Sequence, residues 1–312
     1  MESHRPTSGI LIIDKPKGIT SHDVVARVRK VTGVRKVGHT GTLDPLATGV
    51  LVVCVGQATR LIEYLTTGLK RYRATIRFGL TTDTLDAEGQ VLSRNDVSDL
   101  TQHTLQHLLP TFLGEIEQIP PIFSAIKRNG QPLYKAARAG KSVKIEPRLV
   151  TIYALEWIDW SSPDLILDVS CSSGTYIRAL ARDLGEAAGP GAFLADLTRT
   201  ANHHWLLDDA VSLNTLERAI EAEPLGWQTY LFPPDRAVDH LPKLTLDDLA
   251  ATRVKHGNTI RVANEQIEFD DTQADPNSTL IRAYLPDNRF LAIMELVEAD
   301  ENIWQPKKVF QT

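Results

Sequence analysis

One segment carries the residues best suited to chemistry, the stretch from Val37 to Gly49 (VGHTGTLDPLATG). Its glycines and proline restrict the backbone, and it stands between a basic predicted helix and an apolar predicted strand. Its lone carboxylate, Asp44, is flanked by Leu43 and Pro45, so its charge is poorly solvated unless a cation lies close. Two interpretations fit: a reactive carboxylate on a stiff loop, or an Asp-Pro turn in which Asp44 accepts backbone N–H bonds.

Other chemistries lack their sequence signatures. The chain has no Walker loop, no GxGxxG motif after a strand and no GxSxG elbow. Two cysteines, Cys54 and Cys171, are too few for a disulfide framework or a zinc knuckle and suit a reducing compartment. His203 and His204 are adjacent, which is too close for one helical metal face. We therefore expect no metal site.

The elements that must position the loop follow from periodicity and from Gly and Pro signals. Ser21 is the expected N-cap of the helix before the loop. In the segment 70–78, Tyr72 alternates with arginines and shares its face with apolar residues. The predicted helices are 21–31, 57–66, 101–112, 132–140, 175–188 and 213–223. The predicted strands are 10–13, 50–55, 70–78, 150–157, 165–170, 258–262, 280–284 and 290–296, and 81–89 and 119–130 are predicted loops.

A length of 312 residues suggests two domains. Prolines at 233, 234 and 242 mark the expected boundary. The pattern predicts an α+β domain on a mixed or antiparallel sheet over residues 1–236. It predicts a small C-terminal β-barrel over residues 237–312.

Charge is distributed unevenly along the chain. The formal net charge is -5, yet Asp14–Lys36 holds seven basic and two acidic residues, and Lys127–Arg148 holds seven basic and one acidic. Any one such cluster suits a solvated face, whereas several on an acidic background raise the expectation of a polyanionic partner. The longest strongly apolar stretch, Val50–Val55, is far below the ~20 residues that span a bilayer, and Met1–Ser8 is polar. The sequence thus predicts a cytoplasmic protein without a membrane partner.

The sequence of this loop resembles that of a known protein family. Residues 38–49, GHTGTLDPLATG, resemble the signature of the TruB family, the bacterial tRNA pseudouridine-55 synthases. Other stretches agree in family order: 14–16 (DKP), 70–72 (KRY), 81–89, 118–127 and 173–178 (SGTYIR). The resemblance spans about residues 9–232. The C-terminal region is similar only in general character to PUA-like RNA-binding barrels.

The resemblance implies a pseudouridine synthase fold and the isomerisation of uridine 55 in the T-loop of tRNA. The enzyme would flip the base out, break C1′–N1 and join C1′ to C5, with no cofactor. Asp44 matches the essential aspartate, which either attacks C1′ or removes a ribose proton to give a glycal. The sequence leaves both routes open, and a carboxylate stabilises oxocarbenium character in either. The implied partner is the tRNA T stem-loop, bound by a monomer that needs no protein partner.

Five further residues match the family's substrate site. Arg178 matches the arginine that pairs with the aspartate, although alone it would read as a helix-surface residue. Tyr72 matches a tyrosine that stacks on the uracil, whereas its apolar face also suits a core position. Tyr176 and Leu197 match residues of the base pocket. His39 matches the histidine that fills the gap left by the flipped base, and alone it would be a loop histidine.

The basic clusters then face RNA phosphates. The segment 119–148 resembles a thumb that orders on RNA, and we expect it to be mobile in free protein. The expected backbone contacts are Lys15, Lys17, Arg27, Arg29, Lys127 and Arg128.

Other functions remain to be separated from this one. A non-catalytic tRNA-folding chaperone would use Asp44 only as a turn residue. A nucleoside hydrolase also breaks C1′–N1, but it usually needs clustered carboxylates or a metal. A guide-RNA-dependent relative of the family would carry longer basic tails and extra domains.

Overall fold

The computed structural model describes residues 8–124, 127–128, 131–132, 145–269 and 278–310. Its main sheet has the order β14-β1-β3-β12-β4-β11-β10-β7, with β2 added to β3 and β13 added to β12. Most pairs are antiparallel, while β1/β14 and β3/β12 are parallel. The predicted mixed sheet of an α+β fold is confirmed. Its strands are β1 (Gly9–Lys15), β2 (Val37–His39), β3 (Thr48–Val55), β4 (Lys70–Phe78), β7 (Gly114–Gln118), β10 (Arg148–Ser161), β11 (Asp164–Cys171), β12 (Ala192–Asn202), β13 (Trp205–Leu206) and β14 (Val211–Ser212).

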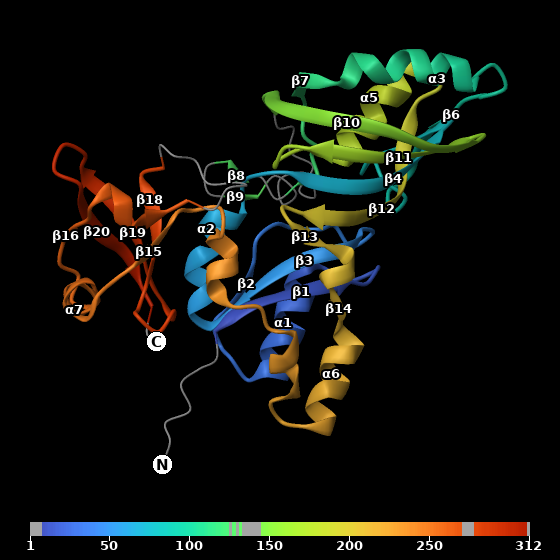
Figure 1. The fold of residues 1–312 in the computed structure, drawn as a ribbon. Helices are drawn as coiled ribbons and strands as arrows, with labels where there is room; N and C mark the ends of the chain where they lie inside the picture. Colours follow the sequence, from blue (N-terminus) through green and yellow to red (C-terminus); the bar gives the residue numbers. More distant parts are fainter. Residues whose placement is uncertain (1–7, 125–126, 129–130, 133–144, 270–277, 311–312) are drawn as a thin grey trace.

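Side-chain alternation along β1 and β3 divides the core into two layers. Leu11 and Ile13 face a cluster with the helices α1, α3, α5 and α6, whereas Ile10 and Ile12 face the opposite side. Figure 1 shows α3 and α5 beside the upper strands and α1 and α6 beside the lower ones. These helices are α1 (Ser21–Thr32), α3 (Gln102–Leu108), α5 (Ile177–Ala188) and α6 (Leu213–Ala222).

The opposite face of β1 and β3 is covered by short helices and by the C-terminal sheet. Ile293 of that sheet and Phe310, which directly follows its last strand, belong to the same buried cluster as Ile10 and Ile12. The short helices are η1 (Gly56–Leu61), α2 (Ile62–Leu65) and η5 (Pro234–Val238). Smaller helical turns are η2 (Leu109–Phe112), η3 (Leu207–Asp209), η4 (Gly226–Tyr230) and η6 (Asn264–Gln266).

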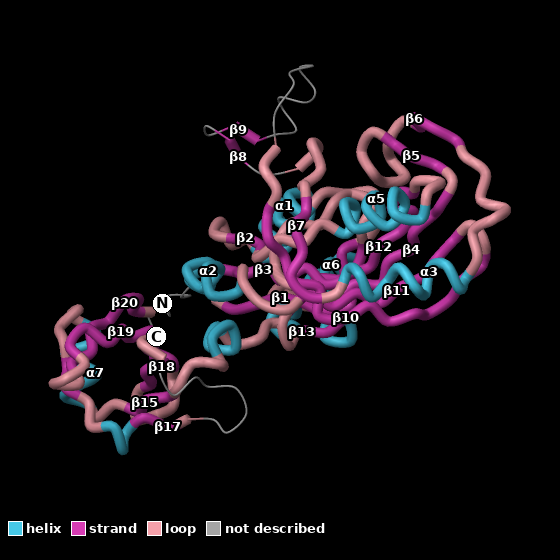
Figure 2. The backbone as a smooth tube through the Cα atoms, turned by 90° about the horizontal axis from the view of Figure 1, so that it is seen from above, coloured by secondary structure: helices cyan, strands magenta, loops and turns pink. Residues whose placement is uncertain are grey.

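The C-terminal sheet is curled, as the view from above shows (Figure 2). Its strand order is β16-β20-β19-β18-β15-β17, and within the described residues the end strands β16 and β17 do not pair with each other. An open, curled sheet therefore stands where a closed barrel was expected. Its elements are β15 (Lys243–Thr245), α7 (Asp248–Lys255), β16 (Ile260–Arg261), β17 (Ile267–Glu268), β18 (Leu280–Tyr284), β19 (Phe290–Glu298) and β20 (Ile303–Val309).

Several local predictions are confirmed and others are corrected. The predicted strand 70–78 is found with the same bounds as β4. Thr20, not Ser21, caps α1, because the Ser21 hydroxyl bonds Leu43 instead. The predicted helix 57–66 divides into η1 and α2. Of the predicted helix 132–140, Pro132 lies in β9 and the remainder is outside the described residues. Two hairpins complete the chain: β5 (Leu80–Thr82) with β6 (Val91–Arg94), and β8 (Lys127–Arg128) with β9 (Gln131–Pro132).

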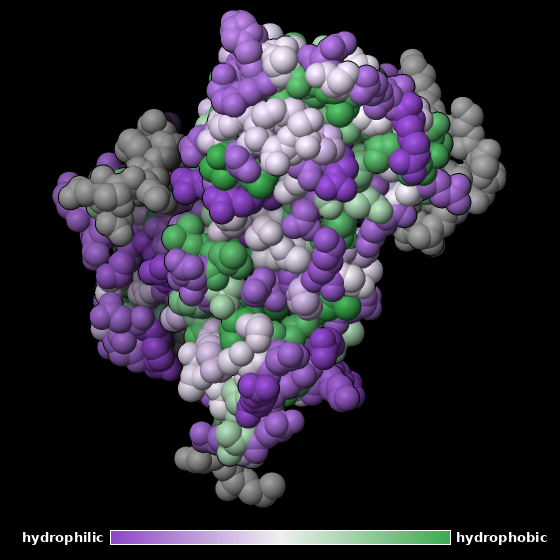
Figure 3. Space-filling view, turned by 90° about the vertical axis from the view of Figure 1, so that its right-hand side faces the viewer, coloured by the Kyte–Doolittle hydropathy of each residue, from purple (hydrophilic) through white to green (hydrophobic). Residues whose placement is uncertain are grey.

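No helix in the described part of the chain is long and apolar enough to cross a bilayer. On the face drawn in Figure 3, apolar residues form small separate groups among polar ones.

Candidate active site

A cleft of about 270 Å³ brings together five of the six predicted catalytic and substrate-binding residues. The loop of residues 40–44 forms one wall, and the start of α5 forms the other. β4 and β12 lie between them. Five predicted residues line this cleft: Asp44, Tyr72, Tyr176, Arg178 and Leu197.

Asp44 and Arg178 form an ion pair in this cleft. Arg178 Nη2 lies 3.0 Å from Asp44 Oδ2, and the arginine side chain is 6% exposed against 39% for the aspartate. The guanidinium also donates to the carbonyls of Thr84 and Phe123, each at 3.0 Å. The buried arginine is therefore fixed by several partners, and the carboxylate sits above it at the mouth of the cleft. Arg178 is not a helix-surface arginine.

Asp86 is a second carboxylate on Arg178, and our sequence reasoning did not single it out. Its Oδ2 lies 3.5 Å from Arg178 Nη1, and its side chain is as buried as the arginine. Thr84 Oγ1 donates to Asp86 Oδ1 at 2.5 Å, and the Glu88 amide donates to the same oxygen at 3.1 Å. Asp86 falls within the stretch 81–89 that carries the family resemblance, which was the available signal.

The electrostatics of the site act on Asp44 in both directions. Desolvation raises the pKa of the Asp44 carboxyl above its ordinary value, Arg178 lowers it, and Asp86 raises it again. The net shift is upward, so the ionised form depends on the arginine beside it. The aspartate is thus more than a turn residue, because its carboxylate forms an ion pair with Arg178 in the cleft.

The turn at the start of α5 sets the positions of Tyr176 and Arg178. Gly174 takes a positive φ of 86°, which favours glycine. The side chain of Gln118 brackets Tyr176: its Oε1 accepts from the Tyr176 amide at 2.8 Å and its Nε2 donates to the Tyr176 carbonyl at 3.1 Å. Arg178 follows in the first turn of the helix, directed into the cleft.

Lys15 supports the loop, and its predicted role in phosphate contact is wrong. The residue is fully buried, and its ammonium donates to the carbonyls of Ala47 at 2.6 Å, Pro16 at 3.0 Å and Pro45 at 3.4 Å. Burial lowers the pKa of the Lys15 ammonium to about 8. An enclosed ammonium cannot meet an external phosphate, so Lys15 holds the Asp44 loop instead.

Tyr72 and Leu197 form the base of the cleft on neighbouring strands. Tyr72 is 9% exposed and belongs to the main core cluster, as a core position requires, and it also lines the cleft. Its stacking on a uracil stays a prediction. Burial raises the pKa of its phenol, which stays neutral. Tyr72 pairs in register with Arg199 on β12, and Arg199 and Lys70 also line the cleft. These two cations were not among the predicted site residues.

His39 lies at the end of β2, half-buried and outside the residues that line the cleft. Burial, helped by the charge of Arg199, lowers the pKa of its imidazole, so the ring is neutral at pH 7. Its role beside a flipped base stays a prediction.

The other predicted phosphate contacts are more exposed than Lys15. Lys17 pairs with Asp196 at 2.8 Å, and Arg27 pairs with Glu217 at 3.2 Å. Arg29 is exposed and donates to the Val37 carbonyl. Lys127 and Arg128 form β8, but the bulk of the predicted thumb 119–148, including residues 133–144, lies outside the described residues.

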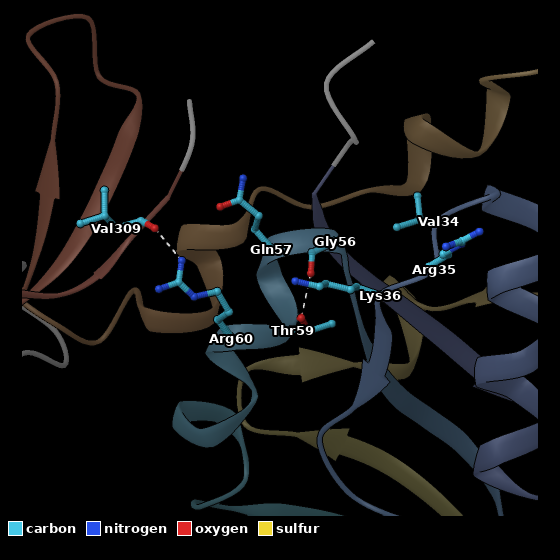
Figure 4. A pocket seen from close by; sticks show the side chains of 8 residues that line it. All are labelled: Val34, Arg35, Lys36, Gly56, Gln57, Thr59, Arg60 and Val309. Carbon is cyan, nitrogen blue, oxygen red and sulfur yellow. Dashed lines mark hydrogen bonds between the residues drawn. The ribbon is translucent and has the colours of Figure 1, made fainter. Parts of the chain in front are cut away.

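A second cavity, of about 580 Å³, opens between the main and C-terminal sheets (Figure 4). Arg35, Lys36 and Arg60 line it, and Arg60 reaches across to donate to the Val309 carbonyl at 2.5 Å. All three cations are exposed. The cations that line this cavity therefore form a positively charged surface beside the junction of the two sheets.

Comparison with known proteins identifies relatives of this chain. Residues 29–177 match the model of the TruB family pseudouridylate synthase (N terminal domain). A tRNA pseudouridine synthase B of Dehalococcoides mccartyi is 43% identical over 303 residues, covering 97% of this chain and 96% of the relative. One from Synechocystis is 49% identical over 255 residues, covering 81% and 85% of the two chains.

Solved structures extend the likeness to three dimensions. A chain of a Cbf5-Nop10-Gar1 complex matches with a TM-score of 0.71 and 26% identity, covering 97% of this chain and 85% of that one. A chain of an H/ACA RNP bound to a substrate RNA containing 2′-deoxyuridine matches with a TM-score of 0.72, 25% identity and the same coverage. Because identity above 40% extends over nearly the whole length, this chain belongs to the TruB family of pseudouridylate synthases.

Proposed function

We propose that this protein isomerises uridine 55 in the T-loop of tRNA to pseudouridine. The observation that carries the proposal is the Asp44–Arg178 ion pair, set in a cleft whose base holds Tyr72 and Leu197. The site offers one ionisable carboxylate at its mouth and one aromatic ring for a flipped pyrimidine. These are the groups that exchange of a C1′–N1 bond for a C1′–C5 bond requires.

In the proposed reaction the target uridine leaves the base stack, at a cost on the order of a few kcal/mol. Tyr72 stacks on the uracil, Tyr176 and Leu197 hold its edges, and His39 occupies the space left in the loop. Asp44 then acts as a carboxylate at C1′, or it takes the ribose proton to give a glycal. Arg178 keeps Asp44 ionised in both routes and stabilises charge near the breaking bond.

The proposed RNA surface surrounds this cleft. Lys17, Arg27 and Arg29 present partly exposed charge for phosphates. We expect Lys127 and Arg128 of β8 to contact phosphates as well. Each phosphate contact that is lost should lower the slope of log K against log salt by ~0.7–0.9.

We propose that residues 1–236 form the catalytic domain and residues 237–312 a PUA-like domain. The curled C-terminal sheet supports the second assignment. The protein acts in the cytoplasm as a monomer on the T stem-loop, without an obligatory protein partner or cofactor. The two solved chains named above come from complexes, and the partners in those complexes belong to those proteins.

The decisive experiment is Asp44→Asn, measured as single-turnover pseudouridine formation on an unmodified tRNA transcript and mapped to the T-loop by mass analysis. We expect product to fall to background while tRNA binding stays within twofold. Asp168→Asn is the matched control, since Asp168 pairs with Arg73 at an exposed site outside the cleft. If Asp44→Asn retained the wild-type rate, the proposal would fail and a folding chaperone would explain the RNA surface better.

A further inference from the structure

Lys70, at the start of β4, is a buried cation at the wall of the cleft. The residue is 5% exposed and lines the same cleft as Asp44 and Tyr72. Its ammonium donates to Asn202 Oδ1 at 2.6 Å, and Asn202 Nδ2 donates to Thr40 Oγ1 at 3.2 Å. The pairing of β4 with β12 places Lys70 opposite Asn202. The ammonium is therefore held in place by a neutral amide.

No carboxylate in the described part of the chain lies within ion-pair distance of Lys70. The charged or titratable groups that act on it are Arg199 and His203 from β12 and the turn after it, and Cys171 from β11. Burial raises the pKa of the Cys171 thiol to about 11, so the thiol is neutral. Arg199 is likewise buried, and the partners of its guanidinium are neutral: the carbonyls of Val50 and Gly41 and the Tyr72 side chain. Two buried cations thus share one wall of the cleft.

Burying an ammonium without a counter-ion costs free energy, so this arrangement needs a reason. The reaction supplies one. When C1′–N1 breaks, the bonding electron pair stays with the uracil, which becomes an anion spread over N1, O2 and O4. A fixed positive charge beside a leaving group that gains negative charge stabilises the transition state, because it needs no reorganisation.

We propose that Lys70, clamped by Asn202, stabilises the uracil anion formed when the glycosidic bond breaks. The inference rests on the proposed function. The electron balance is the same in both routes: Asp44 becomes bonded to C1′, or it holds the H2′ proton while C1′=C2′ forms. C5 then bonds to C1′ as the Asp44–C1′ bond breaks or, in the glycal route, as Asp44 returns the proton to C2′; the C5 proton leaves, and N1 gains a proton. No oxidant or reductant is needed.

The first test is Lys70→Met, which keeps the length and removes the charge. Single-turnover pseudouridine formation should fall about 100-fold, the usual cost of losing one stabilising donor. The Kd for tRNA should stay within twofold, and the Tm will report whether the variant is folded. Lys307→Met is the control, because the exposed Lys307 pairs with Glu295 on the C-terminal sheet, away from the cleft. A folded Lys70→Met variant with the wild-type rate would overturn the inference.

The pH profile separates charge stabilisation from a structural role. Burial, strengthened by Arg199, lowers the pKa of the Lys70 ammonium to about 8. The wild-type rate should therefore fall as pH rises through about 8, and this limb should be absent in Lys70→Met. The buried Lys15 has a similar pKa but is present in both proteins, so it cannot explain the difference.

A second variant keeps the test decisive if Lys70→Met does not fold. Asn202→Asp sets a carboxylate against the ammonium at nearly constant shape. The alkaline limb should move to higher pH, and the rate at pH 7 should fall because the charge is neutralised. The role of Lys70 would be refuted by a wild-type rate that is constant from pH 7 to 9, or by an alkaline limb of the pH profile that Asn202→Asp leaves in place. Either result would leave the proposed function standing. An inactive wild type would instead refute the proposed function.

Discussion

The ion pair in the cleft joins a buried residue, Arg178, to a partly exposed one, Asp44, and this difference in burial gives the two residues different roles. Arg178 is buried and tied to two carbonyls and to Asp86, whereas Asp44 is partly open. The arginine is therefore the fixed partner, and it determines both the direction and the ionisation of the aspartate. Asp86 balances part of the arginine charge from behind. The three residues act as one unit, in which only Asp44 needs to meet substrate.

At this scale we predict the effect of Asp86→Asn. The change removes a charged partner of Arg178 but keeps the shape, and charge-assisted hydrogen bonds are worth about 1.5–3 kcal/mol. A loosened guanidinium should then lower the single-turnover rate at pH 7 by ~10–150-fold. Binding of tRNA should change less than twofold. A rate within twofold of wild type would contradict the unit described above.

The acid limb of the activity profile should also shift in Asp86→Asn, and the direction of the shift follows from the charges around Asp44. Desolvation and Asp86 both raise the pKa of the Asp44 carboxyl, against the effect of Arg178. Wild-type activity should thus be lost on the acid side at a pH above 3.8, the ordinary pKa of an aspartate. Removing the Asp86 charge should move this acid limb to lower pH, even though the rate at neutrality falls. The check is the single-turnover rate measured against pH for both proteins.

The residue types of the cleft were accessible from sequence only through family resemblance. Asp44 alone could be a turn residue, and Tyr72 alone could be core, because local pattern does not show which buried residues border a cavity. Lys15 was misassigned because nothing near it in sequence reveals that the loop folds back and encloses its ammonium. Asp86 was missed because its partner Arg178 lies 92 positions away in the chain.

Among the elements, β12 is the one that the sequence concealed. It is the neighbour of both β3 and β4 and carries Leu197 and Arg199 into the cleft. Its buried positions include the polar Arg199 and Asn202, and bulges at Leu194/Asp196 and Arg199/Ala201 interrupt its two-residue period. A search for alternating apolar and polar residues therefore misses β12, although this strand contributes two residues to the cleft. By contrast, β4 alternates without interruption and was predicted with its bounds.

The contact between β3 and β12 leads to a prediction for Gly49→Ala. Gly49 has a φ of +92°, and an added Cβ would lie 2.3 Å from the Arg199 carbonyl oxygen. Backbone strain and overpacking together should cost about 3 kcal/mol or more. Because Arg199 and the Asp44 loop both depend on this contact, activity should fall along with stability. Urea unfolding and the single-turnover rate at 25 °C would measure the two effects.

The matched control is Gly18→Ala. Gly18 also has a positive φ, +87°, but no described atom lies within 4 Å of the added Cβ. Only the left-handed backbone cost of about 1–2 kcal/mol should appear. If Gly49→Ala and Gly18→Ala lowered the free energy of unfolding equally, the close approach of β3 and β12 would not contribute to the cost of Gly49→Ala.

Over the whole molecule, the two sheets share one buried cluster. Residues 237–312 were predicted as a separate domain because prolines and a change in charge mark its start. In the structure, however, Ile293 and Phe310 pack with Ile10 and Ile12 of β1. Arg60 adds a bond to Val309, and its guanidinium lies 5.1 Å from the centroid of the Phe310 ring. Composition can mark a change of sheet, but it cannot show that the two sides bury the same surface.

We therefore predict that Phe310→Ala destabilises both sheets. Phe310 is 5% exposed, and its ring centroid lies 4.9 Å from that of Phe290. Truncating such a side chain costs about 3–5 kcal/mol. Hydrogen exchange read by mass spectrometry should show protection falling together in β1, β3 and β19, since the cavity opens in their common cluster.

Two further measurements make this prediction specific. Leu249→Ala, at a position that is 75% exposed, should leave protection unchanged. Phe310→Ala should also keep the wild-type single-turnover rate below its melting transition, because the cluster lies on the face of β1 and β3 opposite to the helices that border the cleft. If protection fell in β19 but stayed at the wild-type level in β1 and β3, the sheets would be independent units. The boundary near residue 236 would then also be a boundary of stability.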